Sequence, residues 1–405
     1  MEIEIRPIVS EEVLSWIDRE YLAFGEKVSE AEIQAEAGLL DPGCTLAAWD
    51  ASEIVGGAAR TSFELTVPGA VVPMAAIISV WVVPTHRRRG VLKALMRRQL
   101  DDVRQSGERV AALHASEGWI YGRFGYGMAE YSCRLEIDRR HAAFARSPGE
   151  PARLRLLSRA DALDAFPKVY ERLRLHRPGM PGQSRSWWEY WLRETSPDAD
   201  HAPRLFVACE SEGELEGYVI YRFREQWADS TPKGTIEVEE LLAVTTEAYA
   251  TLWRYCFDMD LTVQTRASNR PIDEPLLLML AEPRRLRLTV SDGLWIRLVD
   301  LPKALAARRY GVEASLVMEV TDEFCPWNTG RFELEGGPEG ATCRRCRRSP
   351  DLALGAHDLA SVYLGGISFR SLHGAGRVIE HRKDALARAD AMFSWHPQPW
   401  CPRRF

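Results

Sequence analysis

Residues 75–126 read AAIISVWVVPTHRRRGVLKALMRRQLDDVRQSGERVAALHASEGWIYGRFGY, and this stretch decides the fold. The apolar, β-branched run Ile77–Val83 predicts a buried strand, which Pro84 ends. From Val91 onward, apolar residues fall on one side of a helix and basic residues on the other. A second strand and a short aromatic turn follow. We therefore predict a strand–helix–strand unit of an α/β fold, with a tight basic turn before its helix.

That turn reads Arg87-Arg88-Arg89-Gly90 and has the features of a phosphate site. Glycine lets the backbone turn without a Cβ clash, so successive N–H groups can point at one place at the start of a helix. Arginines at a helix start oppose the helix dipole, and a bound anion would resolve that conflict. The alternative is that the arginines form a solvated face that serves solubility.

Length and composition set the outer bounds. A chain of 405 residues exceeds one ordinary core and predicts two or three domains. Apolar content of 46% and charged content of 27% are typical of globular proteins, and the net charge of −6 argues against nucleic acid as the main partner. No apolar run approaches the ~20 residues of a membrane helix. The acidic start MEIEIRP is unlike a signal peptide. These features predict a cytoplasmic protein without a membrane partner.

Eight cysteines are scattered along the chain, which fits reduced thiols better than a disulfide framework. Cys343-x-x-Cys346 is half of a zinc knuckle, and Cys325 is a candidate third ligand. No second CxxC or histidine pair completes a four-ligand site. We therefore predict ordinary thiols and no metal.

The chain divides into three predicted units, at 1–145, 146–290 and 291–405. In the first unit we expect helices at 10–24 and 29–38, strands at 2–8, 45–49, 53–65 and 71–83, and a closing strand at 131–137 before a linker at 141–154.

The second unit repeats the element order of the first. We expect helices at 160–175 and 246–257, an aromatic-rich segment at 187–191, a loop at 196–203, and strands at 205–210, 216–223, 235–244 and 261–265. No Arg-x-x-Gly turn joins Val244 to the second helix, so we expect no coenzyme there.

The third unit begins with GLWIRLVDLPKALAARRY at 293–310, which predicts a strand leading into a helix that starts with proline. We then expect strands at 314–321 and 330–334 and helices at 356–363 and 381–393.

The pattern Arg87-x-x-Gly90-x-Leu92, followed by a strand and by Tyr121, resembles the GCN5-related N-acetyltransferases (GNAT). Leu92 departs from the general rule, which has Gly or Ala there. The strings PTHRRRG and AALHASEGWIYGRFGYG are similar to the Eis (enhanced intracellular survival) subfamily, whose members share that departure. The likeness covers the whole chain and implies an acetyltransferase of class EC 2.3.1 that acts on a primary amine. It implies tandem GNAT domains, the second degenerate, and a third domain similar to sterol carrier protein.

The resemblance also implies an acetyl-CoA site in the first domain. The backbone of Val80, Trp81 and Val82 would hydrogen-bond the pantetheine arm as an added strand. The phosphates would lie on the basic turn, and two residues past the second strand would complete the site. The residues implied at these places are Arg88, Arg89, Gly90, Val91, Leu92, Lys93, Ser116 and Glu117.

Two catalytic residues are implied in the same way. Tyr121 would protonate the leaving thiolate, an effect worth roughly 100- to 10,000-fold; the alternative is a structural aromatic residue at a core edge. The α-carboxylate of Phe405 would deprotonate the attacking amine. An α-carboxyl has a pKa of about 3.5, so it is a weak base unless burial raises that pKa. Without the resemblance, the candidate bases are Glu117, His114 and Glu26.

The implied acceptor is an aminoglycoside, a polyamine or a lysine. Glu26 would contact a cationic amine in the acceptor pocket, or simply lie in solvent. The proline-rich tail SWHPQPWCPRRF suits delivery of Phe405 to a distant site, but Arg403 and Arg404 would repel a polycation. The resemblance further implies a homohexamer.

One question about the third domain stays open in the sequence: its apolar groove would hold either lipid or the chain itself, and we favour the chain because most apolar faces are core. The competing interpretation of the whole protein is a non-catalytic module that binds acyl-CoA or lipid.

Overall fold

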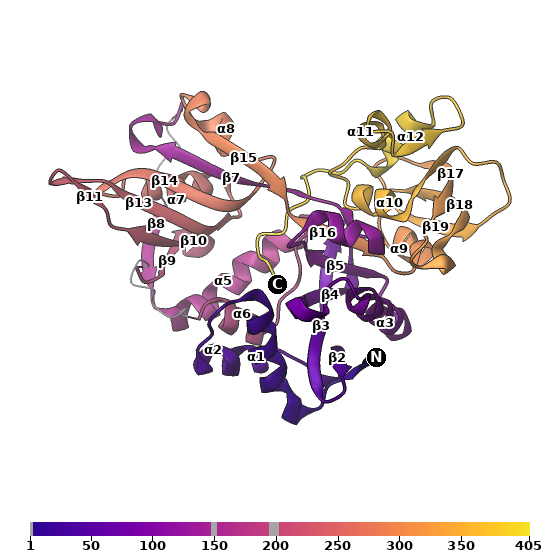
Figure 1. Cartoon of the computed structure of the whole chain (residues 1–405). Coiled ribbons are helices and arrows are strands. Elements are labelled where there is room, and N and C mark those ends of the chain that lie inside the picture. The colour runs from indigo at the N-terminus through magenta and orange to yellow at the C-terminus, as the bar shows by residue number, and fades with distance from the viewer. Residues whose placement is uncertain (1–2, 147–151, 194–201) are drawn as a thin grey trace.

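The protein is described by a computed structural model that covers residues 3–146, 152–193 and 202–405. Its strands form two seven-stranded sheets, a five-stranded sheet and a two-stranded ribbon. Each of the three larger sheets belongs to its own lobe, and the tail of the chain ends between the first two lobes (Figure 1). Among the described residues, no helix combines the length and apolar character that crossing a membrane requires.

The first sheet follows the order β1-β2-β3-β4-β5-β16-β6. β4 and β5 are parallel, and the other neighbours are antiparallel. Its strands are β1 (Glu4–Pro7), β2 (Thr45–Asp50), β3 (Glu53–Val67), β4 (Ala70–Val82), β5 (Val110–His114), β6 (Gly127–Met128) and β16 (Leu294–Leu298).

The helices of the first domain lie close to the predicted positions. Ser29 caps one of them by accepting a hydrogen bond from the Glu32 N–H, and the Glu32 carboxylate accepts one in return from Ser29. The helices and 3₁₀ turns are η1 (Ser10–Glu12), α1 (Val13–Phe24), α2 (Glu30–Ala37), η2 (Pro42–Cys44), η3 (Pro84–His86), α3 (Val91–Ser106), α4 (Gly118–Tyr121) and η4 (Gly122–Phe124).

The second sheet, in the order β15-β7-β14-β13-β10-β9-β8, repeats the plan of the first. Among its described strands, β13 and β14 are the one parallel pair, and α7 connects them. The strands are β7 (Tyr131–Asp138), β8 (Arg153–Leu157), β9 (Leu205–Ser211), β10 (Glu214–Arg224), β13 (Gly234–Ala243), β14 (Thr262–Pro271) and β15 (Arg287–Asp292), with the ribbon β11 (Trp227–Ala228) and β12 (Thr231–Pro232).

The remaining elements of this domain are η5 (Arg139–His141), α5 (Arg159–Arg174), α6 (Arg185–Trp191), α7 (Thr246–Phe257), α8 (Leu276–Met279) and η6 (Pro283–Arg285). The predicted linker at 141–154 includes residues 147–151, and the predicted loop at 196–203 includes residues 196–201; both of these segments lie outside the described residues.

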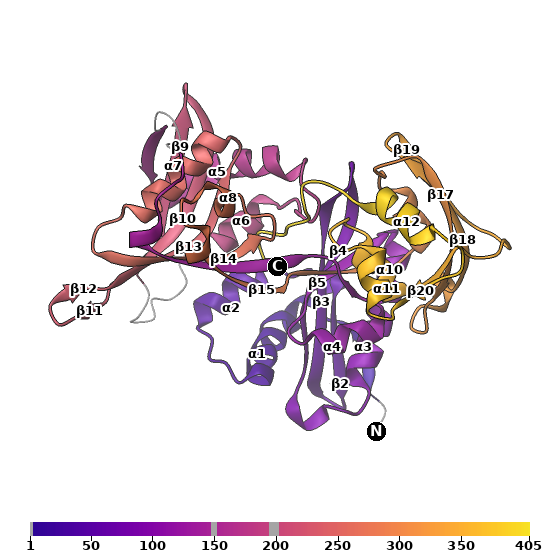
Figure 2. The ribbon, with the colours of Figure 1, turned by 90° about the horizontal axis from the view of Figure 1, so that it is seen from above.

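Two strands belong to a different sheet from the one that the sequence predicts. The strand at 131–137 was expected to close the first domain, but β7 pairs with β14 and β15 in the second sheet. The strand at 294–298 was expected to open the third unit, but β16 lies between β5 and β6 in the first sheet. The two domains thus exchange equivalent strands, and β7 and β15 run side by side from one lobe to the other (Figure 2). Strand sequences carry no signal for which distant strand they will pair with.

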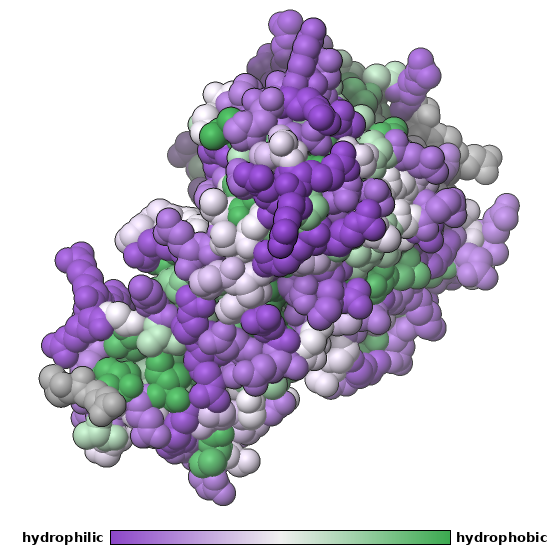
Figure 3. Space-filling view, turned by 90° about the vertical axis from the view of Figure 1, so that its right-hand side faces the viewer, coloured by the Kyte–Doolittle hydropathy of each residue, from purple (hydrophilic) through white to green (hydrophobic). Residues whose placement is uncertain are grey.

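The third domain contains β17 (Ala314–Thr321), β18 (Gly330–Gly337), β19 (Gly340–Arg345), β20 (Leu352–Gly355) and β21 (Val378–Glu380), with α9 (Leu301–Ala306), η7 (Pro326–Asn328), α10 (Ala356–Val362), α11 (Phe369–Gly374) and α12 (Ala385–Phe393). One face of this domain, shown in Figure 3, is mostly hydrophilic, with hydrophobic residues in small separate groups.

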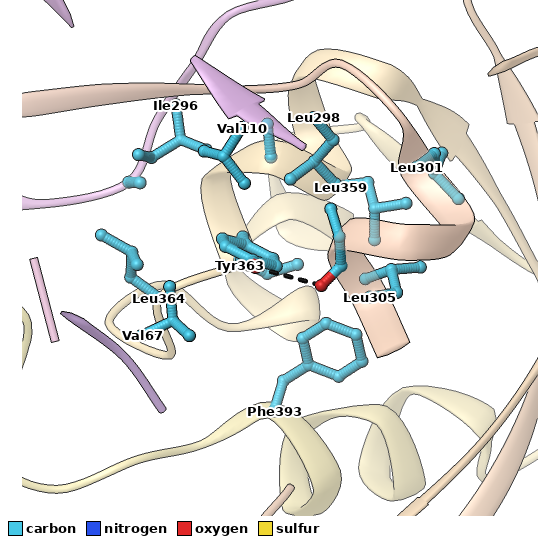
Figure 4. Close-up of a cluster of buried hydrophobic side chains, with 14 of the residues drawn as sticks. Val67, Val110, Ile296, Leu298, Leu301, Leu305, Leu359, Tyr363, Leu364 and Phe393 are labelled. Atoms are coloured by element: carbon cyan, nitrogen blue, oxygen red, sulfur yellow. Dashed lines mark hydrogen bonds between the residues drawn. The ribbon is translucent and has the colours of Figure 1, made fainter. Parts of the chain in front are cut away.

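The apolar interior of the third domain is continuous with the first domain. Figure 4 shows Val67 and Val110 of the first sheet beside Leu364 and Leu359 of the third domain. At the centre of this cluster the Tyr363 hydroxyl donates a hydrogen bond to the Ala304 carbonyl oxygen at 3.0 Å. Side chains of the chain itself therefore occupy this interior, which favours the second of the two interpretations of the predicted groove.

A buried ion pair joins the same two domains. The Arg297 guanidinium, on β16, donates to the Asp322 carboxylate at 2.6 Å, and both side chains are buried. Asn328 donates a further hydrogen bond to the same carboxylate at 3.1 Å. Because a buried charge is tolerated only when it is paired, this contact fixes β16 against the start of the third domain.

Candidate active site

A bulge changes β4 at the place predicted to bind pantetheine. Ser79 has a left-handed backbone, with φ of +52°, and the register against β3 shifts between Ile78 and Trp81. β4 pairs with β5 only from Met74 to Ala76, so the two parallel strands diverge beyond that point. Within the described part of the chain, the β5-facing backbone of Val80–Val82 therefore has no strand partner.

The side chains of this open edge differ in burial. Trp81 is buried and packs edge-on against Trp16, with 5.4 Å between ring centroids, so only its backbone is open to a ligand. Val80 and Val82 are half-buried. An unpaired edge of main-chain donors and acceptors suits an extended chain that carries amide groups.

The turn before α3 has the backbone of an anion site. Arg88 and Gly90 are both left-handed, with φ of +63° and +87°. Gly90 is the N-cap of α3, and a Cβ built on it would meet nothing within 4 Å, so the space in front of the helix is open. The first N–H groups of α3 have no capping side chain. They can therefore donate to an anion placed there.

The basic residues of the turn have different roles. Arg87 is held in place, because its guanidinium donates to the Ala23 carbonyl at 3.0 Å and to the Val82 carbonyl at 3.2 Å. Arg88, Arg89 and Lys93 are exposed and form no hydrogen bond or ion pair with any residue that the structure describes. Val91 is buried and Leu92 half-buried, and they anchor the helix start to the core.

Tyr121 is placed by the segment that follows β5. It ends α4, is 6% exposed, and its ring lies 6.0 Å from that of Tyr126. Burial raises the pKa of the Tyr121 phenol, and a hydrogen bond from Ser116 offsets part of that rise. The phenol is therefore protonated at neutral pH, as a proton donor must be. Glu117 is exposed and accepts a hydrogen bond from the Trp119 indole at 2.6 Å.

Phe405 lies at the end of β5, which leads directly to Tyr121. Its ring is 5.0 Å from that of His114, the last residue of β5, and 5.7 Å from that of Phe63 on β3. Burial, together with the charge of Arg404, lowers the pKa of His114 to about 4. His114 is therefore neutral at pH 7 and is a poor candidate for storing a proton.

Arg403 does not face the acceptor pocket as a free charge, contrary to the prediction from sequence. It is 1% exposed, and its guanidinium makes two hydrogen bonds to Glu240, at 2.7 and 2.6 Å. Burial alone would lower the pKa of Arg403, but the Glu240 carboxylate more than offsets that effect. The guanidinium also stacks over Trp188 at 3.5 Å and Trp191 at 4.0 Å. Arg403 therefore anchors the tail, and only Arg404 remains exposed.

The rest of the tail is held by backbone contacts to the second domain. The Trp400 indole donates to the Asn269 carbonyl at 2.8 Å, and the Asn269 amide donates in turn to the Cys401 carbonyl at 3.0 Å. The Trp400 N–H donates to the Pro178 carbonyl at 2.8 Å. Figure 1 shows the result: the tail leaves the third lobe and ends between the other two.

Two carboxyl groups that the sequence analysis missed lie near each other, and one of them contacts the β4 bulge. Glu20, on α1, is 9% exposed and contacts the Ser79 hydroxyl. Glu36, on α2, accepts a hydrogen bond from the Tyr21 hydroxyl at 3.1 Å. Burial raises the pKa of both carboxyls, that of Glu20 to about 8. Glu26, the predicted contact, is exposed in the loop between the two helices. A signal for Glu20 was present, because it occupies an apolar position in the helical repeat of α1.

A cavity of about 480 Å³ opens between the first and second domains, and its volume fits a small ligand. Phe63 and Trp187 line it, with ring centroids 5.3 Å apart, and the Phe63 ring also touches Phe405. The Phe63 ring therefore contacts both the cavity and the end of the tail. Its other lining residues are Gly38, Leu39, Thr61, Ser62, Glu64, Glu171, Arg174, Gly182, Gln183, Ser184 and Ser186.

Across residues 3–146, 152–193 and 202–405, no group of three or more His, Cys, Asp or Glu side chains could hold a metal ion. Cys343 and Cys346 are half-buried free thiols at and just after β19, and Cys325 is a buried free thiol.

Family models match most of the chain. Acetyltransferase (GNAT) domain models match residues 4–129 and 179–298, and a sterol carrier protein domain model matches residues 301–402. The predicted architecture of two GNAT domains followed by a sterol-carrier-protein domain is thus confirmed.

Relatives that align with most or all of the chain support the same family. An uncharacterized N-acetyltransferase of Streptomyces avermitilis is 44% identical and aligned over 100% of both chains. N-acetyltransferase Eis of Mycobacterium tuberculosis is 37% identical over 85% of this chain and 84% of its own. The crystal structure of Eis1 from Mycobacterium abscessus superposes with a TM-score of 0.86 at 35% identity over 100% of both chains. A GCN5-related N-acetyltransferase from Anabaena variabilis has the same fold, with a TM-score of 0.86 at 20% identity.

Proposed function

Because this chain belongs to the Eis family of GCN5-related N-acetyltransferases, we propose that it transfers the acetyl group of acetyl-CoA to a primary amine by direct attack in a ternary complex. The single observation that carries the proposal is the bulged edge of β4 beside the open turn at Gly90. The hexameric assembly and the cytoplasmic location stay predictions of the sequence analysis.

Acetyl-CoA fits the residues of the first domain. The backbone of Val80–Val82, which has no partner strand on its β5 side among the described residues, would take the amides of the pantetheine arm, and the N–H groups at Gly90–Lys93 would take the pyrophosphate. Arg88, Arg89 and Lys93 carry charges that no described residue neutralises, which suits the remaining phosphate. Ser116 and Glu117 would complete the site between this turn and Tyr121.

The described residues of the second domain form no equivalent place. Thr245, the N-cap of α7, accepts a hydrogen bond from the Ala248 N–H at 3.3 Å, so a side chain already satisfies this helix start. Only Val244 and Thr245 connect β13 to α7, which leaves no room for a glycine-rich turn. We therefore expect one acetyl-CoA per chain.

The proposed reaction needs two proton transfers. The amine nitrogen attacks the thioester carbonyl carbon, and the carbon–sulfur bond breaks as the amide forms. The Phe405 carboxylate would take a proton from the amine, and the Tyr121 phenol would give one to the departing CoA sulfur. The raised pKa of Tyr121 supports this assignment, since the phenol holds its proton until a thiolate develops.

The proposal is tested by measuring CoA release with a panel of amines and acetyl-CoA binding by calorimetry. Tyr121→Phe should lower kcat by roughly 100-fold or more with unchanged acetyl-CoA affinity. Tyr126→Phe is the matched control, because that hydroxyl is buried in the same cluster and has no partner among the described residues. Removal of Phe405 should also lower kcat.

If every variant and the wild type bind acetyl-CoA but none releases CoA above background with any amine, the protein is a binding module and the proposal fails. A second bound equivalent of acetyl-CoA would contradict the assignment of the second domain.

A further inference from the structure

Glu20 is a buried carboxyl group without a counterion. It belongs to the buried stripe of α1, between Ile17 and Ala23, yet it carries an ionisable carboxyl where its neighbours in the stripe are apolar. It is 9% exposed, its Oε2 atom has no hydrogen-bond partner, and it forms no ion pair with any residue in 3–146, 152–193 or 202–405. Burial of such a group is costly unless a cation or a hydrogen-bond donor is supplied from elsewhere.

The surroundings of Glu20 are acidic. Glu36 and Glu26 both act on it electrostatically, and its one polar contact is the neutral Ser79 hydroxyl at the β4 bulge. Among the described cations, Arg193 stacks over Tyr190 at 3.5 Å and acts on Glu36, and Arg87 donates to the Ala23 carbonyl of α1, but neither forms an ion pair with these carboxyls. Neighbouring carboxyls that no described ion pair relieves favour a further positive charge.

Aromatic rings connect this acidic site to the reacting end. The Tyr190 ring lies 5.9 Å from that of Trp187, which lies 5.3 Å from Phe63, which in turn lies 5.7 Å from Phe405. These rings offer apolar contact and cation–π attraction. They suit a methylene chain with an ammonium group at its far end, and the polar side chains that also line the cavity can solvate the reacting amine.

We infer that Glu20 and Glu36 form a subsite for a second ammonium group of the acceptor, so that the substrate is a molecule whose reacting amine and second amine are separated by an apolar spacer. This inference rests on the proposed acetyltransferase function. The amine that attacks lies near Phe405 and Tyr121, and the amine that does not react lies beside Glu20. Binding of the second ammonium supplies a counterion, so that the Glu20 carboxyl, which burial keeps protonated at neutral pH, releases its proton to solvent.

The test compares α,ω-diamines with alkyl monoamines of equal length in the CoA-release assay. With the wild type, the diamine should show a KM lower by about tenfold or more, since a charge-assisted contact is worth that much. In Glu20→Gln the diamine KM should rise to the monoamine value, with kcat and the monoamine KM unchanged. Glu36→Gln should act in the same direction.

Asp18→Asn and Glu30→Gln are the controls, because both carboxylates are exposed on the same two helices. A thermal melt shows whether Glu20→Gln folds, and we expect it to be at least as stable as the wild type. Equal changes in the diamine and monoamine KM, or no change in either, would overturn the inference while leaving the acetyltransferase function intact. A Glu20 dependence seen only with an aminoglycoside would overturn the apolar spacer.

If the wild type acetylates no amine at all, the proposed function fails, and calorimetry with the diamine then decides the inference by itself. Diamine binding that is lost in Glu20→Gln upholds the subsite, and binding that is absent from the wild type or equal in the two proteins rejects it.

Discussion

Replacement of Arg403 by methionine should detach the last residues of the chain from the second domain. In the folded protein the Arg403 guanidinium makes two hydrogen bonds to Glu240, one to Gln183 at 2.8 Å and one to the Tyr218 hydroxyl at 3.2 Å. Methionine keeps the apolar stem but leaves the Glu240 carboxylate buried and without its cation. The tail beyond Cys401 then loses its main attachment.

The size of the effect follows from the burial of the pair. Removal of one partner from a buried ion pair costs about 3–5 kcal/mol, and every 1.4 kcal/mol is a factor of ten, so the detached population should rise by roughly 100- to 5,000-fold. The bonds between Trp400 and Asn269 do not involve Arg403 and should persist. The loss therefore falls on the segment that carries Phe405, and we expect kcat to fall with an unchanged affinity for acetyl-CoA.

Carboxypeptidase release of Phe405 measures the detached population directly, because cleavage tracks the open form when opening and closing are fast. The rates are divided by those of free peptides with the same last residues, which removes the sequence preference of the protease. Arg404→Met is the matched control, since Arg404 is exposed and has no hydrogen bond or ion pair with a described residue. It should leave the release rate near that of the wild type.

Two results would refute this reasoning. One is that Arg403→Met and Arg404→Met release Phe405 at the same rate. The other is that acetyl-CoA affinity falls together with kcat, which indicates damage to the whole domain. Arg403→Met combined with Glu240→Leu should recover thermal stability, because an apolar pair of similar volume replaces a buried ion pair at little cost.

Further predictions concern the coenzyme turn, pH and the domain contact. Gly90→Ala and Gly107→Ala should each lower the free energy of unfolding by about 1–2 kcal/mol, because both glycines have a left-handed backbone with open space around a Cβ. In calorimetry, only Gly90→Ala should weaken acetyl-CoA binding. The pKa of Glu20 is about 8 in the folded protein, above its ordinary value of 4.5. Its contribution to the free energy of unfolding is therefore fully present below pH 4.5 and is lost as the pH rises through 8. Melting temperatures of Glu20→Gln and the wild type should therefore diverge over that range, in favour of the variant. Arg297→Met should lower the free energy of unfolding by about 3–5 kcal/mol in urea, whereas Arg98→Met, at an exposed helical ion pair, should cost less than about 1 kcal/mol.

The strand–turn–helix at the centre of the first domain could be predicted because its signals are local. An apolar run, a proline, a glycine and a helical repeat lie within a few residues of one another, and the structure has β4, the left-handed Gly90 and α3 at those places. The repeated element order of the second domain was visible for the same reason. The helix caps at Ser29 and Thr245 also follow from neighbouring residues.

The strand exchange and the burial of Arg403 could not be predicted, because each depends on a distant partner. β7 and β16 are ordinary strands in sequence, and only the assembled sheets decide which edge each one joins. Arg403 meets Glu240, 163 positions earlier in the chain. No residue near either partner in sequence indicates this ion pair. The sequence alone therefore predicts that the basic tail is a charged surface. Glu20 differs, since its place in the apolar stripe of α1 was visible.

The charge that an acceptor meets therefore depends on which groups are already paired. The sequence places two arginines beside Phe405 and predicts repulsion of cations, but Glu240 cancels one of them and the other is exposed to solvent. Glu20, by contrast, forms no ion pair with a described residue. Because an ammonium bound beside Glu20 would favour its ionised form, and solvent screens the exposed Arg404, the site should prefer amines that carry a second ammonium group, the reverse of the expectation from sequence.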